Sequence, residues 1–167
     1  MRTVRVRAQS PDRSVVAAMN AETGLAVRFE LGALNRHDRD SLAVQVRRAV
    51  SGVLEAYRRA ADEVLRRDFG ADSLAEARRT GAGQRLQPFL DALERVEVKA
   101  VGPREVAKVG MTEGRFRVAF RDEALDLGES GLAAEIEAAL SAMFDRRAEA
   151  AARLYEELVV GEVAEAA

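Results

Sequence analysis

The sequence predicts an α+β protein that is built from two tandem units. Each unit is expected to be a three-stranded antiparallel meander followed by a long amphipathic helix. Two observations lead to this prediction. Apolar residues alternate with polar ones over three short runs, and then recur every three or four residues over a run of about 28 residues. The same order of runs is also written twice along the 167 residues.

The two copies align as a duplication would. Residues 4–8 (VRVRA) correspond to residues 96–100 (VEVKA) at an offset of 92, which falls to 91 in the third run and to 90 in the helix. Both shifts fall in loops, which tolerate changes of length. We therefore predict four regions: a first unit at 1–69, a linker with short helices at 70–94, a second unit at 95–160 and a loose tail at 161–167.

Strands of the first unit are expected at residues 3–9, 14–20 and about 25–31. The apolar residues that should face inwards along the third strand end at Leu31. The turns fall at residues 10–13 (SPDR) and 21–24 (AETG), because Ser, Pro, Asp and Gly favour turn positions. Such short connections favour antiparallel pairing.

A long helix follows from Asp38 or Asp40 to about Arg67, with its apolar stripe starting at Leu42 and Val46. A helix of this length spans about 42 Å, whereas strands of six or seven residues span only about 20–24 Å. The helix must therefore overhang its own sheet. Since its apolar stripe continues through Tyr57 onto the overhang, we expect the second unit to cover it.

The second unit repeats the pattern with strands near 95–101, 105–112 and 115–121 and a helix at about 130–158. Arg147 stands where the first copy has Tyr57. In the linker, we expect Ser73 to cap a short helix, the run 81–83 (GAG) to form a flexible joint, and Pro88 to open a second short helix.

The order of these elements resembles the YbaB/EbfC family, most closely its actinobacterial branch. The resemblance rests on the run VRVRAQSPD at 4–12, on Gly24 with the alternating run to Leu31, and on five helix positions, Leu42, Ala43, Val46, Ala49 and Val50. It implies a nucleoid-associated protein that binds DNA with little sequence preference and pairs into a tight dimer. Two copies in one chain then imply an intramolecular pseudo-dimer.

The chain departs from the family pattern at three points. The first copy begins directly at its strand without the family's leading helix, and the second has only a short candidate for it near 88–95. The family's Ser-Pro-Asp-Gly turn ends in Arg13 in the first copy and reads GPRE at 102–105 in the second. Because the leading helix contributes to the surface that the family is thought to use for DNA, its loss weakens that implication.

The total charge hides an asymmetry between the copies. The net charge of the chain is −2, yet residues 1–70 hold 13 Arg and 9 acids, and residues 96–167 hold 9 bases and 15 acids. The first copy is therefore at +4 and the second at −6. We expect DNA contacts from an arginine face of the first helix, formed by Arg47, Arg48, Arg58, Arg59, Arg66 and Arg67.

Two other interpretations stay open. The arginines alternate with Glu55, Asp62 and Glu63, so the face can also be an ordinary solvated one. The second helix presents acids at the corresponding positions, Glu135, Glu137, Asp145, Glu149, Glu156 and Glu157. These would repel DNA and favour a protein partner, as in an adaptor or a secretion-associated chaperone.

Enzymatic chemistry finds no support in the sequence, and we expect no cofactor and no metal. The chain has no Cys and one His, His37, which we expect in a surface loop. The acidic residues Asp122, Glu123, Asp126 and Glu129 lack the spacing of a calcium loop, so a solvated helix entry is expected there. We find no signal peptide and no run long enough to span a membrane, so a cytoplasmic location follows.

Overall fold

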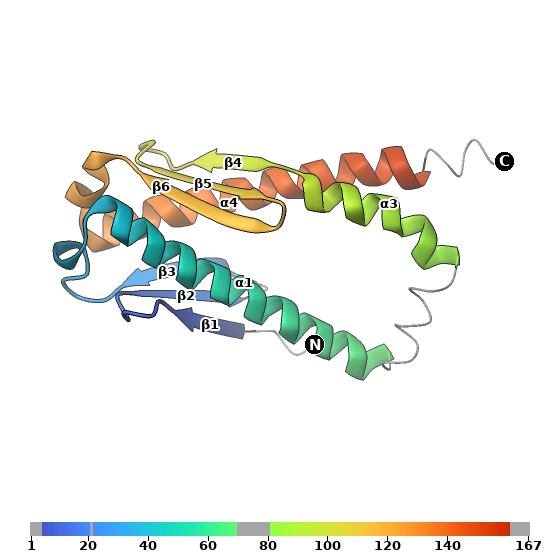
Figure 1. Cartoon of the computed structure of the whole chain (residues 1–167), viewed down its shortest axis with the longest axis horizontal. Helices are drawn as coiled ribbons and strands as arrows, with labels where there is room; N and C mark the ends of the chain where they lie inside the picture. The colour runs from blue at the N-terminus through green and yellow to red at the C-terminus, as the bar shows by residue number, and fades with distance from the viewer. Residues whose placement is uncertain (1–4, 21, 70–80, 161–167) are drawn as a thin grey trace.

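A computed structural model of the chain describes residues 5–20, 22–69 and 81–160, apart from the side chains of residues 65, 66, 68, 69, 81–85, 159 and 160. Within them the chain forms two three-stranded antiparallel sheets and three α-helices (Figure 1). The expected α+β class is therefore confirmed. Each half of the chain contributes one sheet and one long helix, in the same order. None of the described helices is long and apolar enough to cross a membrane.

The first half forms the predicted meander and helix. Its elements are β1 (Arg5–Gln9), β2 (Val15–Asn20), β3 (Gly24–Phe29), the short 3-10 helix η1 (Leu34–Arg36) and α1 (Arg39–Phe69). The strands pair in the order β1-β2-β3. The prediction that Leu31 ends the inward face was wrong, because β3 ends at Phe29 and Leu31 is 93% exposed. There the N–H of Ala33 donates to the carbonyl of Glu30, which turns the chain away from the sheet.

The second half repeats this arrangement with sheet order β4-β5-β6. Its elements are β4 (Val98–Val101), β5 (Ala107–Thr112), β6 (Arg115–Phe120), the 3-10 helix η2 (Asp122–Leu127), α4 (Gly128–Tyr155) and the π-helical turn η3 (Glu156–Val160). Val109 pairs with Ala100 on one side and with Val118 on the other, so the apolar residues of the three strands share one face.

One long helix replaces the expected joint and short helix in the second part of the linker. Helix α3 (Gly81–Arg95) has 15 residues and includes Pro88, so a joint at 81–83 and a helix start at Pro88 were both wrong. Proline removes a helical hydrogen bond, but α3 packs on α4 and η3, where Phe89 meets Tyr155 edge-on with ring centroids 5.7 Å apart. This packing supports the helix through the proline. The helix expected after Ser73 lies outside the described residues.

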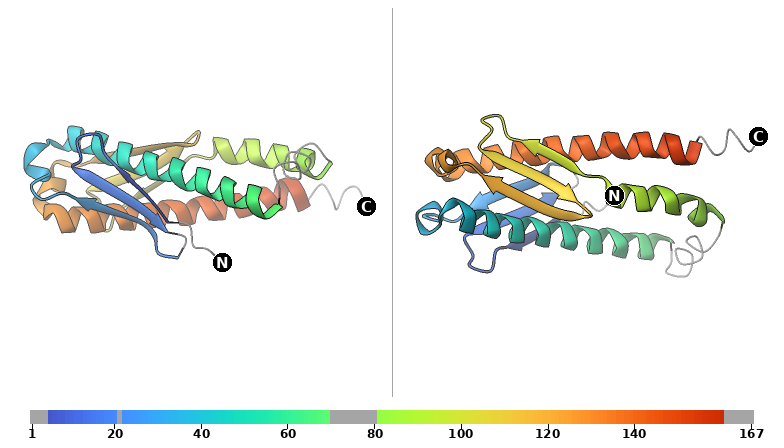
Figure 2. Two further views of the ribbon diagram at one scale, coloured as in Figure 1. Left: turned by 90° about the horizontal axis from the view of Figure 1, so that it is seen from below. Right: turned by 45° about the horizontal axis from the view of Figure 1, so that its top comes forward.

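Each long helix contacts both sheets. Helix α1 packs on β1 and β2 of its own half and on β6 of the other, and α4 packs on β4 and β5 of its own half and on β3 of the other. The right-hand view of Figure 2 shows the sheets one in front of the other, with α4 above them and α1 below. The fully buried part of the α1 stripe ends at Val53, whereas Tyr57, Ala61 and Val64 on the overhang are only half-buried. The second half therefore covers the stripe beside the sheets and leaves the overhang partly open.

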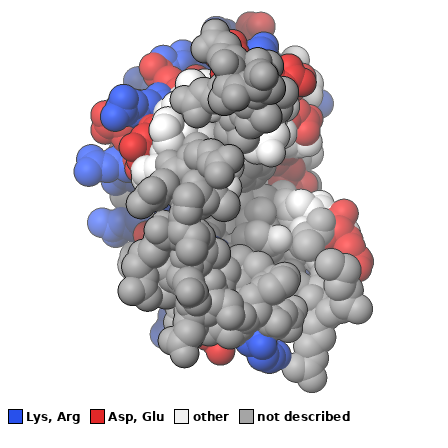
Figure 3. Space-filling view, turned by 90° about the vertical axis from the view of Figure 1, so that its right-hand side faces the viewer, with Lys and Arg blue, Asp and Glu red and all other residues white. Residues whose placement is uncertain are grey.

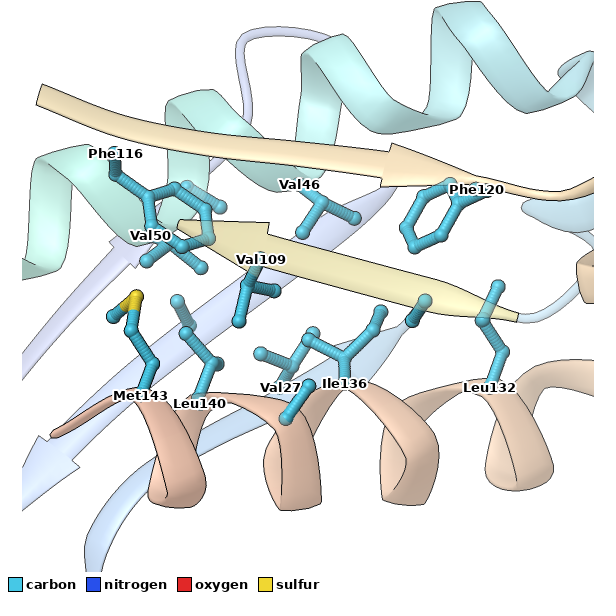
Figure 4. Packing of buried hydrophobic residues seen from close by; sticks show 14 of the residues in the cluster. Val27, Val46, Val50, Val109, Phe116, Phe120, Leu132, Ile136, Leu140 and Met143 are labelled. Atoms are coloured by element: carbon cyan, nitrogen blue, oxygen red, sulfur yellow. The ribbon is translucent and has the colours of Figure 1, made fainter. Parts of the chain in front are cut away.

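The two halves share one hydrophobic core. Figure 4 shows Val27 and Val46 of the first half packed among Val109, Ile136 and Leu140 of the second. All five side chains are at most 1% exposed. Burial of such aliphatic side chains stabilises a fold by about 1.5–3 kcal/mol each. One continuous core therefore holds both sheets and both long helices together.

Both halves place a residue with a side chain in the left-handed region of backbone space. Arg13 has φ of 64° in the turn between β1 and β2, and Glu105 has φ of 57° in the corresponding turn between β4 and β5. A Cβ atom is unfavourable there, whereas glycine adopts this conformation without cost. Both turns are thus strained at the position where the resembled family has glycine.

Replacing these residues by glycine is expected to stabilise the protein. Arg13→Gly and Glu105→Gly should each raise the free energy of unfolding by about 0.5–1 kcal/mol, since the relief of backbone strain exceeds the entropy that glycine adds to the unfolded chain. Chemical denaturation measures the change. Arg13→Ala is the control, because it removes the charge but keeps the Cβ. An equal gain from alanine would show that strain is not the cause.

Candidate nucleic-acid interface

The arginine face of α1 is exposed over the part that the structure describes. Arg47, Arg48, Arg58, Arg59 and Arg67 are all solvent-exposed. None of these five side chains forms a hydrogen bond or ion pair with another described residue. The side chain of Arg66, the sixth arginine expected here, lies outside the described ones. The five guanidinium groups are therefore available to an external anion.

These arginines form two rows on α1 rather than one patch. Residues 11 apart lie about three helical turns apart on the same face, so Arg47 aligns with Arg58 and Arg48 with Arg59. Arg47 and Arg58 border a groove beside β6. The other row lies towards β1. Gly52 follows Arg48 by one helical turn and packs closely on Ala8 of β1. A Cβ at Gly52 would lie 3.1 Å from that of Ala8.

The strands carry a second set of basic residues that the sequence interpretation missed. The six strands contain seven charged residues and no acidic one. All seven are basic and exposed, namely Arg5, Arg7, Arg28, Lys99, Lys108, Arg115 and Arg117. The alternation along each strand predicted that these side chains face the solvent. It did not indicate which sheet edges would lie beside which helix.

The strands that flank α1 hold four of these seven residues. Helix α1 lies between β1, with Arg5 and Arg7, and β6, with Arg115 and Arg117. The strands of the other side, β3 and β4, carry one basic residue each, and Lys99 on β4 pairs with Glu97 at 2.5 Å. We call the surface formed by β1, α1 and β6 the α1 side. It joins strands from the two halves of the chain.

Acidic side chains interrupt this surface. On the helical wheel, Glu55 and Asp62 fall between the two arginine rows of α1. In the end-on view of Figure 3, basic and acidic side chains alternate along the left-hand margin. The α1 side is therefore a mixed surface with a basic excess.

The acids at the start of α4 do not form the free surface that we expected. Glu137 accepts a hydrogen bond of 2.8 Å from the backbone N–H of Val27 in β3. Glu129 accepts from the N–H groups of Gly32 and Ala33 at 2.6 and 3.1 Å. All three donors belong to the first half. The expectation of a solvated acidic entry was therefore wrong for Glu129, and Glu137 is an internal acceptor between the halves.

Glu135 also has a structural role. It is only 4% exposed, and its carboxylate accepts from the N–H groups of Arg104 and Val106, at 3.1 and 3.2 Å to Oε1. A Cβ at Gly102 would lie 2.3 Å from this carboxylate, so the turn requires glycine there. The acids of the second helix that stay exposed among those we named are Asp145, Glu149, Glu156 and Glu157.

The first half caps its corresponding turn from within. Asp12 Oδ1 accepts from the N–H of Ser14 at 3.0 Å and from the hydroxyls of Ser10 and Ser14 at 2.7 and 2.8 Å. Burial alone would raise the pKa of Asp12, but these hydrogen bonds and the nearby His37 outweigh it and lower the pKa from 3.8 to about 2. The ionised carboxylate therefore stabilises the turn.

His37 connects this turn to the start of α1. Its Nε2 lies 2.8 Å from Asp12 Oδ2, its Nδ1 lies 3.3 Å from Ser41 Oγ, and its side chain is 13% exposed. His37 lies in the loop before α1, as expected, but its side chain is largely buried and is not a surface one. The Ser-His-Asp order does not make a catalytic triad, because the Ser41 hydroxyl donates to the carbonyl of Asp38 within the helix cap. Neither His37 nor Ser41 lines any of the cavities described.

Neither metal binding nor similarity to known proteins supplies further evidence about this surface. The described residues contain no group of three or more His, Cys, Asp or Glu side chains that could hold a metal ion. Comparison of the chain with protein-family models, with curated proteins and with solved structures found no match.

The contact between Glu137 and β3 is expected to stabilise the whole chain. Glu137→Ala leaves the N–H of Val27 without its charged acceptor, which should lower the free energy of unfolding by about 1–2 kcal/mol. Glu149→Ala on the same helix is the matched control, and it should change stability by less than about 0.5 kcal/mol. Equal effects of the two substitutions in urea unfolding would show that the contact between the halves contributes nothing.

Acid should weaken the fold through Asp12. Its folded-state pKa of about 2 lies below the ordinary 3.8, so its contribution is present above pH 4 and is lost as the pH falls towards 2. The stability difference between wild type and Asp12→Asn should therefore shrink over that range in urea unfolding. Asp126→Asn, at an exposed position, should show no such trend. A constant difference between wild type and Asp12→Asn would contradict the role given to this carboxylate.

Proposed function

We propose that the chain is a non-enzymatic, nucleoid-associated protein of the cytoplasm that binds duplex DNA with little sequence preference. The α1 side is the proposed contact surface. The observation that carries the proposal is the set of exposed α1 arginines without protein partners, flanked by Arg5 and Arg7 on β1 and by Arg115 and Arg117 on β6. Arginine and lysine side chains that contact phosphates supply the sequence-independent part of DNA affinity.

The spacing of the arginine rows suits a duplex backbone. Arg47 and Arg58 lie about 16 Å apart along the helix axis, which is about five base-pair steps of B-DNA. Arg48 and Arg59 repeat this spacing in the second row, about 100° further round the helix. Arginine contacts to phosphates carry no sequence information, so binding with little sequence preference is the expected mode.

We further propose that the chain is a tandem member of the YbaB/EbfC family and that its halves form an intramolecular pseudo-dimer. Three observations support this. Each helix packs on the edge strand of the other half, α1 on β6 and α4 on β3. The positive φ values of Arg13 and Glu105 occur where the family has glycine. Helix α3 is long enough to be the leading helix of the second copy, which the sequence had left as a short candidate.

A protein-interaction adaptor, which includes a secretion-associated chaperone, is the second candidate function. The exposed acids at the far end of the second half, Asp145, Glu149, Glu156 and Glu157, favour it. They leave that end unsuited to DNA and suited to a basic protein surface. In this case the α1 arginines would be a solvated face, and the chain would bind no duplex.

DNA binding at two salt concentrations tests the proposal. We expect a 30-base-pair duplex to bind at 50 mM NaCl, with an affinity that falls steeply by 200 mM because bound phosphates release counterions. The double variant Arg48→Gln/Arg59→Gln removes one arginine row. It should weaken binding and reduce the slope of log K against log salt by about 1.8, or 0.9 for each lost phosphate contact. Fluorescence anisotropy measures both quantities.

The matched control is Arg28→Gln/Arg153→Gln, which removes the same charge from β3 and α4 on the opposite side of the molecule. It should leave the salt slope unchanged. An equal effect of both double variants would mean that net charge and not the α1 side governs binding. Absence of binding to any duplex at 50 mM salt would refute the DNA proposal and favour the adaptor.

A further inference from the structure

A groove opens where α1, α4 and the hairpin of β5 and β6 meet. Its volume is about 650 Å³, which lies within the range of small-ligand sites. Four arginines from three different elements line it, Arg47 and Arg58 from α1, Arg115 from β6 and Arg147 from α4. Glu55 is the one acid among the lining residues. The groove therefore carries a strong local excess of positive charge.

The floor of the groove is apolar and aromatic. Leu54 and Tyr57 of α1, Phe116 of β6 and Phe144 of α4 line it. A bare phosphate or a DNA backbone would leave this floor unused. A ligand that fits both features carries a negative charge on an apolar or aromatic body.

Arg147 gives the clearest sign of a missing partner. Its Nη1 nitrogen is buried and has no hydrogen-bond partner among the described residues. Guanidinium N–H groups are obligatory donors, and leaving one buried and unpaired is costly. The corresponding position of the first half is Tyr57, which lines the same groove and brings no charge. The second half therefore has a cation, Arg147, at the position where the first half has the aromatic ring of Tyr57.

We propose that this groove binds an organic anion. Its oxyanion, a phosphate or a carboxylate, pairs with Arg147 between the flanking Arg47 and Arg58, and its apolar body lies on Leu54, Phe116 and Phe144. The groove shares Arg47, Arg58 and Arg115 with the proposed DNA surface, whereas Arg48 and Arg59 do not line it. The proposal rests on Arg147 and the apolar side chains, which the DNA proposal does not use, so it does not depend on DNA binding.

A pair of fluorescent probes with the same aromatic body tests the proposal on the full chain. One is 8-anilinonaphthalene-1-sulfonate, and the other is N-phenyl-1-naphthylamine, which lacks the sulfonate. The anionic probe should bind one to one and at least tenfold more tightly than the neutral one, because only the anion pairs with Arg147. Equal affinities of the two probes would overturn the proposal.

Arg147→Met separates a ligand-binding role from a structural one. The substitution keeps the apolar stem and removes the unpaired donor, so the thermal midpoint should stay the same or rise. Binding of the anionic probe should weaken at least tenfold, whereas Arg153→Met, which removes an exposed arginine from the same helix, should leave it unchanged. A loss of probe binding that accompanies a lower midpoint, or equal binding by both variants, would contradict the assignment.

Competition identifies the class of anion. Octyl phosphate or octanoate should displace the anionic probe, and whichever competes better names the preferred oxyanion. Displacement by neither compound would overturn the proposal. Duplex DNA should compete with the probe only in part, because the two share Arg47, Arg58 and Arg115 and not Arg147. Arg147→Met should leave DNA binding unchanged. If it weakens DNA binding in parallel with probe binding, the groove belongs to the DNA surface and the ligand site is refuted.

Discussion

The fold depends on one constraint, that neither three-stranded sheet can be covered by its own helix alone. An edge strand exposes unpaired backbone groups and an apolar border, and β3 and β6 are the edges that each sheet turns towards the other half. The helix of the opposite half covers each of them. At β3 the cover includes a specific bond, because Glu137 of α4 accepts the N–H of Val27. Each half therefore supplies the helix that covers an edge strand of the other.

This constraint accounts for a part of the charge difference between the two long helices. Glu129 and Glu137 on α4 accept from backbone donors of the first half, and the residues 90 positions earlier are Arg39 and Arg47. Arg39 pairs with Asp122 of the second half at 2.5 Å, and Arg47 faces the groove beside β6. The two helices therefore hold corresponding places with opposite charges. The acids at the start of α4 serve the contact between the halves, whereas the side chain of Arg47 has no partner among the described residues.

The sequence predicts those parts of the fold that depend on hydrophobic periodicity and on the residues of the turns. The strands, the two long helices and the antiparallel order follow from alternation and from turns such as the Ser-Pro-Asp run at residues 10–12. Helix α3 was underestimated because Pro88 reads as a helix start, whereas packing of Phe89 on Tyr155 carries the helix past it. The contact between Phe89 and Tyr155 outweighs the tendency of Pro88 to break a helix, and the sequence of either segment alone does not indicate this contact.

The candidate site was only half predictable for a similar reason. The arginine rows on α1 are visible from their spacing of 11, but the contribution of β1 and β6 depends on which strands flank that helix. The roles of Glu135 and Glu137 depend on where turns and edge strands present their N–H groups. Net charge does not distinguish a buried carboxylate that accepts hydrogen bonds from a charge on the surface. The packing of the two halves shows which acids stabilise the fold and which charges are exposed to solvent.

DNA binding through the α1 side requires that β1 and β6, strands from different halves, form one binding surface with α1 between them. Titration of the ¹⁵N-labelled chain with a short duplex at low salt, followed by amide chemical-shift mapping, tests this requirement most directly. We expect the amides of β1, α1 and β6 to shift together, with the same saturation, while those of β3 and β4 stay in place. Shifts confined to one half, or centred on α4, would contradict it.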